Sequence, residues 1–255
     1  MILTVISPAK KLDYTGAITT DSYSEPALLE HSKELLEGLK TLSPQDVCAL
    51  MGLSDTLGAL NYERFQEWKT PFNTDNARPA VLAFKGDVYQ GLDAANMTED
   101  DLDWAQSTLR ILSGLYGVLR PLDLMQPYRL EMGTKFANQR GPNLYAFWDG
   151  IITRELNILL KKSTDVLVNL ASNEYFKAAQ ENNITGRIVT PVFMDNKDGK
   201  YKIISFFAKK ARGLMAAFII KGKITDIEDI KNFDIDGYNF NSAMSEGDKW
   251  VFTRG

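Results

Sequence analysis

The chain has 255 residues, of which 44% are hydrophobic and 24% are charged, and its formal net charge is −4. These values exclude a disordered chain and are typical of a globular protein, so we expect one α/β domain over residues 1–255. One cysteine and one histidine exclude a disulfide within the chain, a zinc site built from those residue types and a Cys/His nucleophile pair.

The apolar start of the chain, 1–6, is too short to cross a membrane and lacks the features of a secretory signal. No other stretch reaches the roughly eighteen apolar residues that a membrane span needs. Cys48 has apolar neighbours, which predicts a buried small hydrophobe and not a redox sensor. The sequence therefore predicts a soluble cytoplasmic protein.

Strands and helices are predicted to alternate along the chain. Helical spacing occurs over 26–39, over 44–68 with a break at Gly52, and over 99–106, 147–160 and 206–217. Ser43 and Thr98 are expected to cap two of these helices. Aliphatic or β-branched runs predict strands at 2–6, 80–84, 109–112, 165–170, 187–193, 201–205 and 250–253. Turn residues at 195–199 predict a hairpin, and the alternation predicts a mixed sheet covered by helices.

Polar segments follow four of the predicted strands, at 7–13, 85–89, 113–117 and 171–177. Ligands of open α/β sheets bind at the carboxyl ends of strands, so we expect these segments to line one cleft. Lys10, Lys11 and Lys85 would form a positive floor that suits phosphate. The other candidate cleft residues are Ser7, Asp87, Tyr89, Ser113, Tyr116, Ser172, Glu174 and Tyr175. The alternative is a set of ordinary turns, with Ser172 as a helix cap and Tyr175 facing the core.

Two further segments concentrate positive charge. Segment 120–135 contains two prolines and is predicted to be an ordered loop in which Arg120 and Arg129 reach an anionic partner. Its alternative is an internal network of ion pairs that fixes the loop. Segment 205–218 is predicted to be a helix that presents Lys209, Lys210 and Arg212 to an anionic partner. The alternative is that these charges form an ordinary solvated face of the helix.

Six motifs resemble, in this order, those of the YaaA family of bacterial peroxide-stress proteins. They are SPAKKLD at 7–13, FKGDVYQGL at 84–92, LSGLYGVLRPLD at 112–123, PYRLEMGT at 127–134, NLASNEY at 169–175 and AKKARG at 208–213. The resemblance implies a protein of the hydrogen peroxide stress response that limits unincorporated iron and oxidative DNA damage. It also implies duplex DNA binding through a positive cleft and a helix-hairpin-helix element, on an α/β fold peculiar to the family.

The residues offer a place for the helix-hairpin-helix element at 49–60. Gly52 would close the first helix and Ser54 would begin the second, so that backbone N–H groups meet a DNA phosphate. The alternative is a pair of scaffold helices, and segment 112–119 is a weaker second candidate for the element.

Two functions remain open at this stage. The leading one is duplex DNA binding, with candidate contacts at Lys10, Lys11, Gly52, Ser54, Lys85, Arg120, Arg129, Lys209, Lys210 and Arg212. The alternative is an enzyme that binds a nucleotide-like or other small phosphate-bearing ligand, with Lys10 or Lys85 as a clamp and Asp87 or Glu174 as acid or base. The chain has no phosphate-binding GxxxxGK[ST] loop and no GxGxxG, and the sequence predicts no cofactor, no metal and no assigned catalytic residue.

Overall fold

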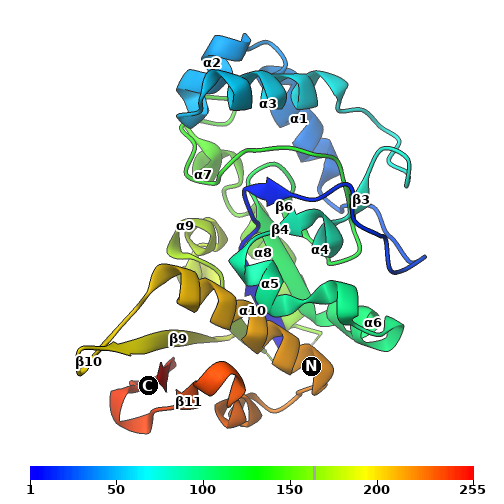
Figure 1. The fold of residues 1–255 in the computed structure, drawn as a ribbon. Helices are drawn as coiled ribbons and strands as arrows, with labels where there is room; N and C mark the ends of the chain where they lie inside the picture. The colour runs from blue at the N-terminus through cyan, green and yellow to red at the C-terminus, as the bar shows by residue number, and fades with distance from the viewer. Residues whose placement is uncertain (163–164) are drawn as a thin grey trace.

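The central sheet gathers strands from both ends of the chain (Figure 1). A computed structural model describes residues 1–162 and 165–255. The strand order is β11-β12-β9-β8-β1-β5-β6, with β10 paired to β9. The bounds are β1 (Leu3–Ile6), β5 (Leu109–Ser113), β6 (Gly117–Leu119), β8 (Val166–Leu170), β9 (Arg187–Lys197), β10 (Lys200–Lys202), β11 (Asn239–Phe240) and β12 (Lys249–Arg254).

Strand β1 lies inside the sheet and is buried at all four of its residues. It pairs in parallel with β8 on one side and with β5 on the other. A strand covered on both faces reads as a continuous apolar run, which explains the sequence of β1. Strands β6, β10 and β11 pair antiparallel to their neighbours. The predicted mixed sheet is therefore confirmed.

Helices cover the sheet and extend beyond one end of it. Figure 1 shows α1, α2 and α3 together at that end, whereas α10 passes across the sheet with α5 beside it. The bounds are α1 (Leu29–Leu39), α2 (Pro44–Met51), α3 (Asp55–Glu67), α4 (Ala80–Ala83), α5 (Asp87–Leu92), α6 (Glu99–Thr108), α7 (Leu144–Phe147), α8 (Ile151–Leu160), α9 (Asn173–Phe176) and α10 (Ser205–Lys221). Among the described residues, no helix has the length and hydropathy needed to cross a bilayer.

Several local predictions are confirmed by the backbone. Ser43 and Thr98 each form a capping box with an aspartate three residues later. Strands β9 and β10 form the predicted hairpin, and its two turn residues, Asp198 and Gly199, have φ angles of 56° and 75°. Positive φ at both turn residues matches the right-handed twist of the paired strands.

The strand predicted at 80–84 is wrong. Residues Ala80–Ala83 form the short helix α4, since a brief apolar run with two alanines does not distinguish a strand from a buried helical turn. The flanking residues pair outside the central sheet. Strand β3 (Arg78–Pro79) pairs with β7 (Leu124–Met125), and β4 (Phe84–Lys85) pairs with β2 (Lys11–Leu12).

Candidate functional site

A cleft opens at the carboxyl ends of β1 and β8. Because these strands are parallel neighbours, the residues that follow them meet at one edge of the sheet. Ser7 Oγ accepts a hydrogen bond from the Ser172 backbone N–H at 2.8 Å and lies 3.3 Å from Ser172 Oγ. Two segments 165 residues apart are thereby joined at the floor of the cleft.

The short pair β2 and β4 forms a second wall of the cleft. Its register places Lys11 opposite Lys85, so two like charges face each other across the strands. The cleft has a volume of about 510 Å³. Residues of the predicted set that line it are Ser7, Lys10, Lys11, Lys85, Asp87, Arg129, Ser172, Glu174, Tyr175, Lys209 and Arg212.

Half of the cationic side chains in the cleft are neutralised by ion pairs. Lys10 Nζ lies 2.6 Å from Glu131 Oε2, and Arg129 Nη2 lies 3.1 Å from the other oxygen of the same carboxylate. Lys85 Nζ lies 3.0 Å from Asp13 Oδ2. The Lys85 ammonium and the N–H groups of Thr15 and Gly16 hold the pKa of Asp13 far below its usual range. These pairs organise the walls and reduce their positive charge.

Lys11, Lys209 and Arg212 form no ion pair with any residue that the structure describes. Arg212 is half-buried, and burial lowers the pKa of its guanidinium. A buried guanidinium normally has an anionic partner because desolvation of an unpaired charge costs free energy. Its five N–H donors suit the oxygens of a phosphate or carboxylate. The unpaired donors of the cleft are therefore of the kind that complements an oxyanion.

Backbone contact between α5 and α10 fixes Arg212 and Lys209 over the cleft. A Cβ atom added to Gly213 would lie 1.8 Å from Val88 O, and one added to Gly91 would lie 2.2 Å from Lys210 O. Only glycine permits this approach, which joins the helix that carries Arg212 to the helix that begins with Asp87.

Three predicted cleft residues lie beneath the cleft and do not line it. Ser113 and Tyr116 are fully buried because β5 turns directly into β6, with Ser113 paired to Gly117. Ser113 Oγ lies 2.6 Å from the hydroxyl of Tyr128, and that tyrosine does line the cleft. Tyr89 is buried and donates to Ser7 O at 3.1 Å. The prediction that segment 113–117 lines the cavity is thus corrected, and its residues support the floor.

Two of the predicted basic DNA contacts, Arg120 and Lys210, also lie outside the cleft. Arg120 Nη2 lies 2.8 Å from the buried Asp123 carboxylate and donates to Glu25 O. Lys210 lies 3.6 Å from Asp236 on another side of α10. The ion pairs of Arg120 with Asp123 and of Arg129 with Glu131 form the internal network that was the alternative for segment 120–135. Tyr128, which lines the cleft, was not among the predicted cleft residues. Its position next to the predicted contact Arg129 could have indicated it.

The helix pair α2 and α3 carries Gly52 and Ser54 at its turn. Gly52 has a φ of 60°, and the Leu53 N–H donates to Cys48 O. A Cβ added to Gly58 would lie 2.0 Å from Cys48 Sγ, so this half-buried thiol packs against the second helix. A second hollow, which shares Glu131 and Glu174 with the cleft, reaches the last residues of α2. This hollow therefore links the cleft to the end of α2, which precedes the turn.

Comparison with known proteins places the chain among relatives of matching length. A family model described as peroxide stress protein YaaA matches residues 2–244. A UPF0246 protein of Saccharophagus degradans is 63% identical over 254 residues, and one of Teredinibacter turnerae is 62% identical over 254 residues. Each of these alignments covers 99% of both chains. A UPF0246 protein of Colwellia psychrerythraea is 56% identical over the same length and coverage.

Proposed function

The chain belongs to the peroxide stress protein YaaA family, and we propose that it serves the peroxide stress response by binding duplex DNA across its cleft. The family name supports the role in peroxide stress. Following the resemblance of its motifs, the proposal includes that this binding helps to limit oxidative DNA damage and that the protein limits unincorporated iron.

The observation that carries the DNA proposal is the set of three cations at the cleft that have no ion-pair partner among residues 1–162 and 165–255. Lys11 and Lys209 are exposed, and Arg212 is half-buried in the lining of the same cleft. A volume of about 510 Å³ is too small for a duplex, so the duplex would lie across the mouth and place backbone phosphates against these side chains. Such contacts position DNA without reading its sequence.

The hairpin between α2 and α3 offers a second phosphate contact on the connected surface. Ser54 begins α3 but forms no side-chain capping bond. The N–H groups of the first turn of α3 are therefore open to an anion, as at other helix N-termini. Asp55 in that turn opposes such binding, which makes the turn an auxiliary contact and the cleft the main one.

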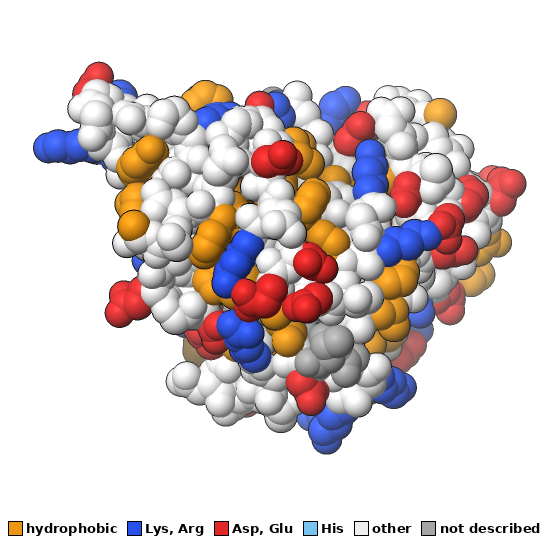
Figure 2. Space-filling model, turned by 90° about the horizontal axis from the view of Figure 1, so that it is seen from below, with side chains coloured by type: hydrophobic (Ala, Val, Ile, Leu, Met, Phe, Trp, Pro, Cys, Tyr) orange, Lys and Arg blue, Asp and Glu red, His pale blue; other side chains and the backbone are white. Residues whose placement is uncertain are grey.

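Charge distribution on another face favours this orientation. Figure 2, viewed from below, shows basic and acidic side chains interspersed over that face. A duplex needs a continuous positive surface to release its counterions. The mixed charge of this face therefore makes it a poorer docking side than the cleft.

A salt titration tests the proposal with a cleft variant, in which Lys11→Ala, Lys209→Ala and Arg212→Gln are combined. Each neutralised phosphate contributes about 0.9 to the slope of log affinity against log salt, so the variant should flatten the slope by about 2 to 3 units. Fluorescence anisotropy of a labelled duplex across a salt series measures the slope.

The matched control removes three lysines at the opposite edge of the sheet. Lys161, Lys162 and Lys249 lie near the amino ends of β8 and β12 and are exposed. Their triple alanine variant changes the net charge equally and should keep the wild-type slope. Equal flattening in both variants would show a general charge effect and would remove the cleft from the binding surface.

A second candidate is a small phosphate-bearing ligand in the same cleft. The volume lies within the range of small-molecule sites, and Arg212 lies inside it without a carboxylate partner among the described residues. Duplex affinity that is identical in wild type and in the cleft variant at every salt concentration would shift the assignment to this candidate.

A further inference from the structure

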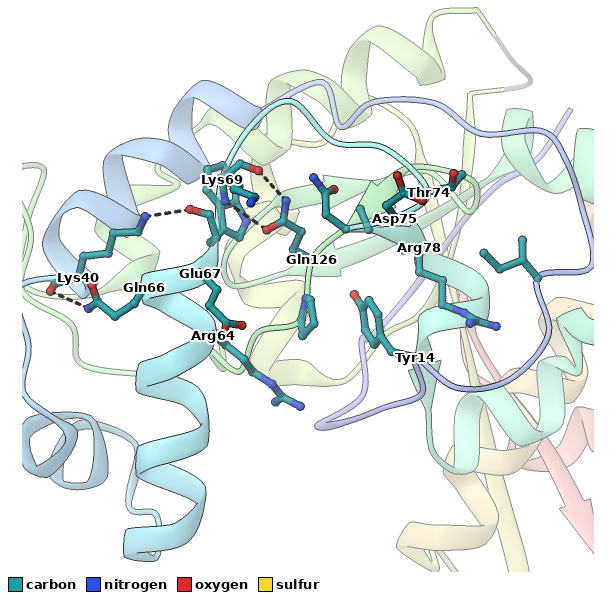
Figure 3. Close-up of a pocket in the computed structure, with 15 residues that line it drawn as sticks. Tyr14, Lys40, Arg64, Gln66, Glu67, Lys69, Thr74, Asp75, Arg78 and Gln126 are labelled. Carbon is teal, nitrogen blue, oxygen red and sulfur yellow. Dashed lines mark hydrogen bonds between the residues drawn. The ribbon is translucent and has the colours of Figure 1, made fainter.

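A second large pocket lies between the carboxyl-terminal part of α3 and the loop that follows β2 (Figure 3). Its volume is about 750 Å³, and it shares no lining residue with the cleft. None of the predicted cleft or DNA-contact residues lines it. Trp68, Pro127 and Ile18 supply apolar surface, and the other lining residues are mostly polar or charged.

Arg78 lines this pocket with donors that are not satisfied. The residue is only 5% exposed, and its Nη2 donates to Ala17 O at 2.6 Å. Its Nε is buried and has no hydrogen-bond acceptor within the described residues. No carboxylate among those residues forms an ion pair with Arg78. A buried guanidinium without an anion is costly, so the arrangement points to an anionic group that is bound from outside.

Arg64 supplies a second guanidinium from a different element. It is half-buried in α3, and its Nη1 donates to Asn61 Oδ1 at 3.2 Å. Figure 3 shows Tyr14 between Arg64 and Arg78. The hydroxyl of Tyr14 donates to Met125 O at 2.7 Å, so this hydroxyl is bound to the backbone and the two arginines lie on either side of Tyr14.

The charge of the lining indicates which anion fits. Four cationic side chains line the pocket, namely Lys40, Arg64, Lys69 and Arg78, against the two carboxylates Glu67 and Asp75. The surplus of two positive charges matches a phosphate monoester, which is largely dianionic at neutral pH because its second pKa is about 6. A carboxylate or an internal phosphodiester carries only one negative charge. Arginine also presents paired N–H donors to phosphate oxygens.

We propose that the pocket between Arg64 and Arg78 binds a phosphate monoester, with the organic part of the ligand against Trp68 and Pro127. The site is independent of the cleft and of the DNA proposal. Two sources share this chemistry: a free small molecule such as a nucleoside monophosphate, and the terminal phosphate of a DNA end.

The test uses the full chain carrying the cleft substitutions, so that the cleft does not contribute. Isothermal titration with adenosine monophosphate should show binding, whereas adenosine, which lacks the phosphate, should not bind. Adding Arg64→Gln should weaken the binding roughly tenfold because one charge-assisted pair of hydrogen bonds is lost. Arg187→Gln is the control. Arg187 is the first residue of β9, is exposed and forms an ion pair with Asp248.

A duplex with terminal phosphates and the same duplex with terminal hydroxyls distinguish the two sources. If the protein prefers the phosphorylated duplex and Arg64→Gln abolishes that preference, the ligand is a DNA end. If the protein binds both duplexes with equal affinity, the ligand is a free phosphate ester. Arg78→Lys, which keeps the charge but loses the fork of donors, should also weaken monophosphate binding. The proposal is overturned if the monophosphate does not bind, or binds equally to folded Arg64→Gln and Arg78→Lys proteins.

Discussion

His31, the one histidine of the chain, lies in an environment that favours the neutral imidazole over the charged form. Arg140 Nη2 lies 2.9 Å from His31 Nδ1, and since arginine only donates, Nδ1 must accept. The ring also packs edge-to-face on Trp148, with centroids 5.9 Å apart. Burial and then the charge of Arg140 lower the pKa of His31 below its usual value of 6.5.

This lowered pKa predicts a loss of stability on mild acidification. The unfolded chain binds a proton at His31 near pH 6.5, whereas the folded chain binds it only at lower pH, so the free energy of unfolding falls as pH decreases through this window. His31→Gln, which keeps an acceptor for Arg140, should flatten the dependence. Urea unfolding between about pH 7 and pH 5 measures it. A histidine NMR titration that gives a pKa of 6.5 or above would contradict the prediction.

At the scale of elements, the contact of α5 with α10 determines the shape of the cleft. Gly213→Ala would place a Cβ atom 1.8 Å from Val88 O, so the two helices would have to separate. Overpacking of this kind should destabilise the fold by roughly 2 to 3 kcal/mol and move Lys209 and Arg212 away from the cleft. Urea unfolding checks the stability, and duplex binding checks the displacement.

Gly16→Ala is the matched control for that substitution. The nearest atoms to a Cβ at Gly16 lie 3.6 Å away, which is ordinary contact. Its stability should stay within about 0.5 kcal/mol of wild type. A Gly213→Ala protein that unfolds at the same urea concentration as Gly16→Ala would show that the helix contact is adaptable.

Elements with a continuous β-branched or strongly capped pattern were predictable from the sequence. β1 and β8 have apolar runs, and Ser43 and Thr98 give clear helix starts, so the sheet edge that carries Ser7 and Ser172 was found. The segment at 80–84 was not, because its strand or helix state depends on hydrogen bonds to distant residues, such as Ala80 N to Asp123 O. Periodicity contains no information about such partners.

The sequence predicted which segments form the candidate site, but it did not predict which of their charges are neutralised by ion pairs. The sequence indicates Lys10, Lys11 and Lys85 equally, whereas the fold pairs Lys10 with Glu131 and leaves Lys11 without an ion pair among the described residues. Arg78 was missed because it comes from a segment without a motif, and its position on the other side of Tyr14 from Arg64 arises only in the fold. Pairing depends on tertiary contacts that spacing along the chain does not specify.

At the scale of the molecule, a second hollow links the cleft to the end of α2, next to the α2–α3 turn. Glu131 and Glu174 border both hollows, and Glu174 accepts from the Gly133 N–H at 2.9 Å. A duplex that contacts Lys11 and Lys209 would extend toward Gly52. If one duplex contacts both places, losses of binding free energy at the two sites should add, since distant sites behave independently.

Gly52→Asn tests this extended contact. No atom lies within 4 Å of a Cβ at Gly52, and the φ of 60° is one that asparagine tolerates. The fold should survive, whereas the β-branched Gly52→Val would add backbone strain. The asparagine side chain would stand between the turn and a phosphate, so duplex affinity should fall several-fold, and further when combined with the cleft variant. Anisotropy titration measures the duplex affinity of the variant, and thermal melting measures its stability. If the variant melts like wild type and keeps the wild-type affinity, the α2–α3 turn is scaffold and the duplex contacts the cleft alone.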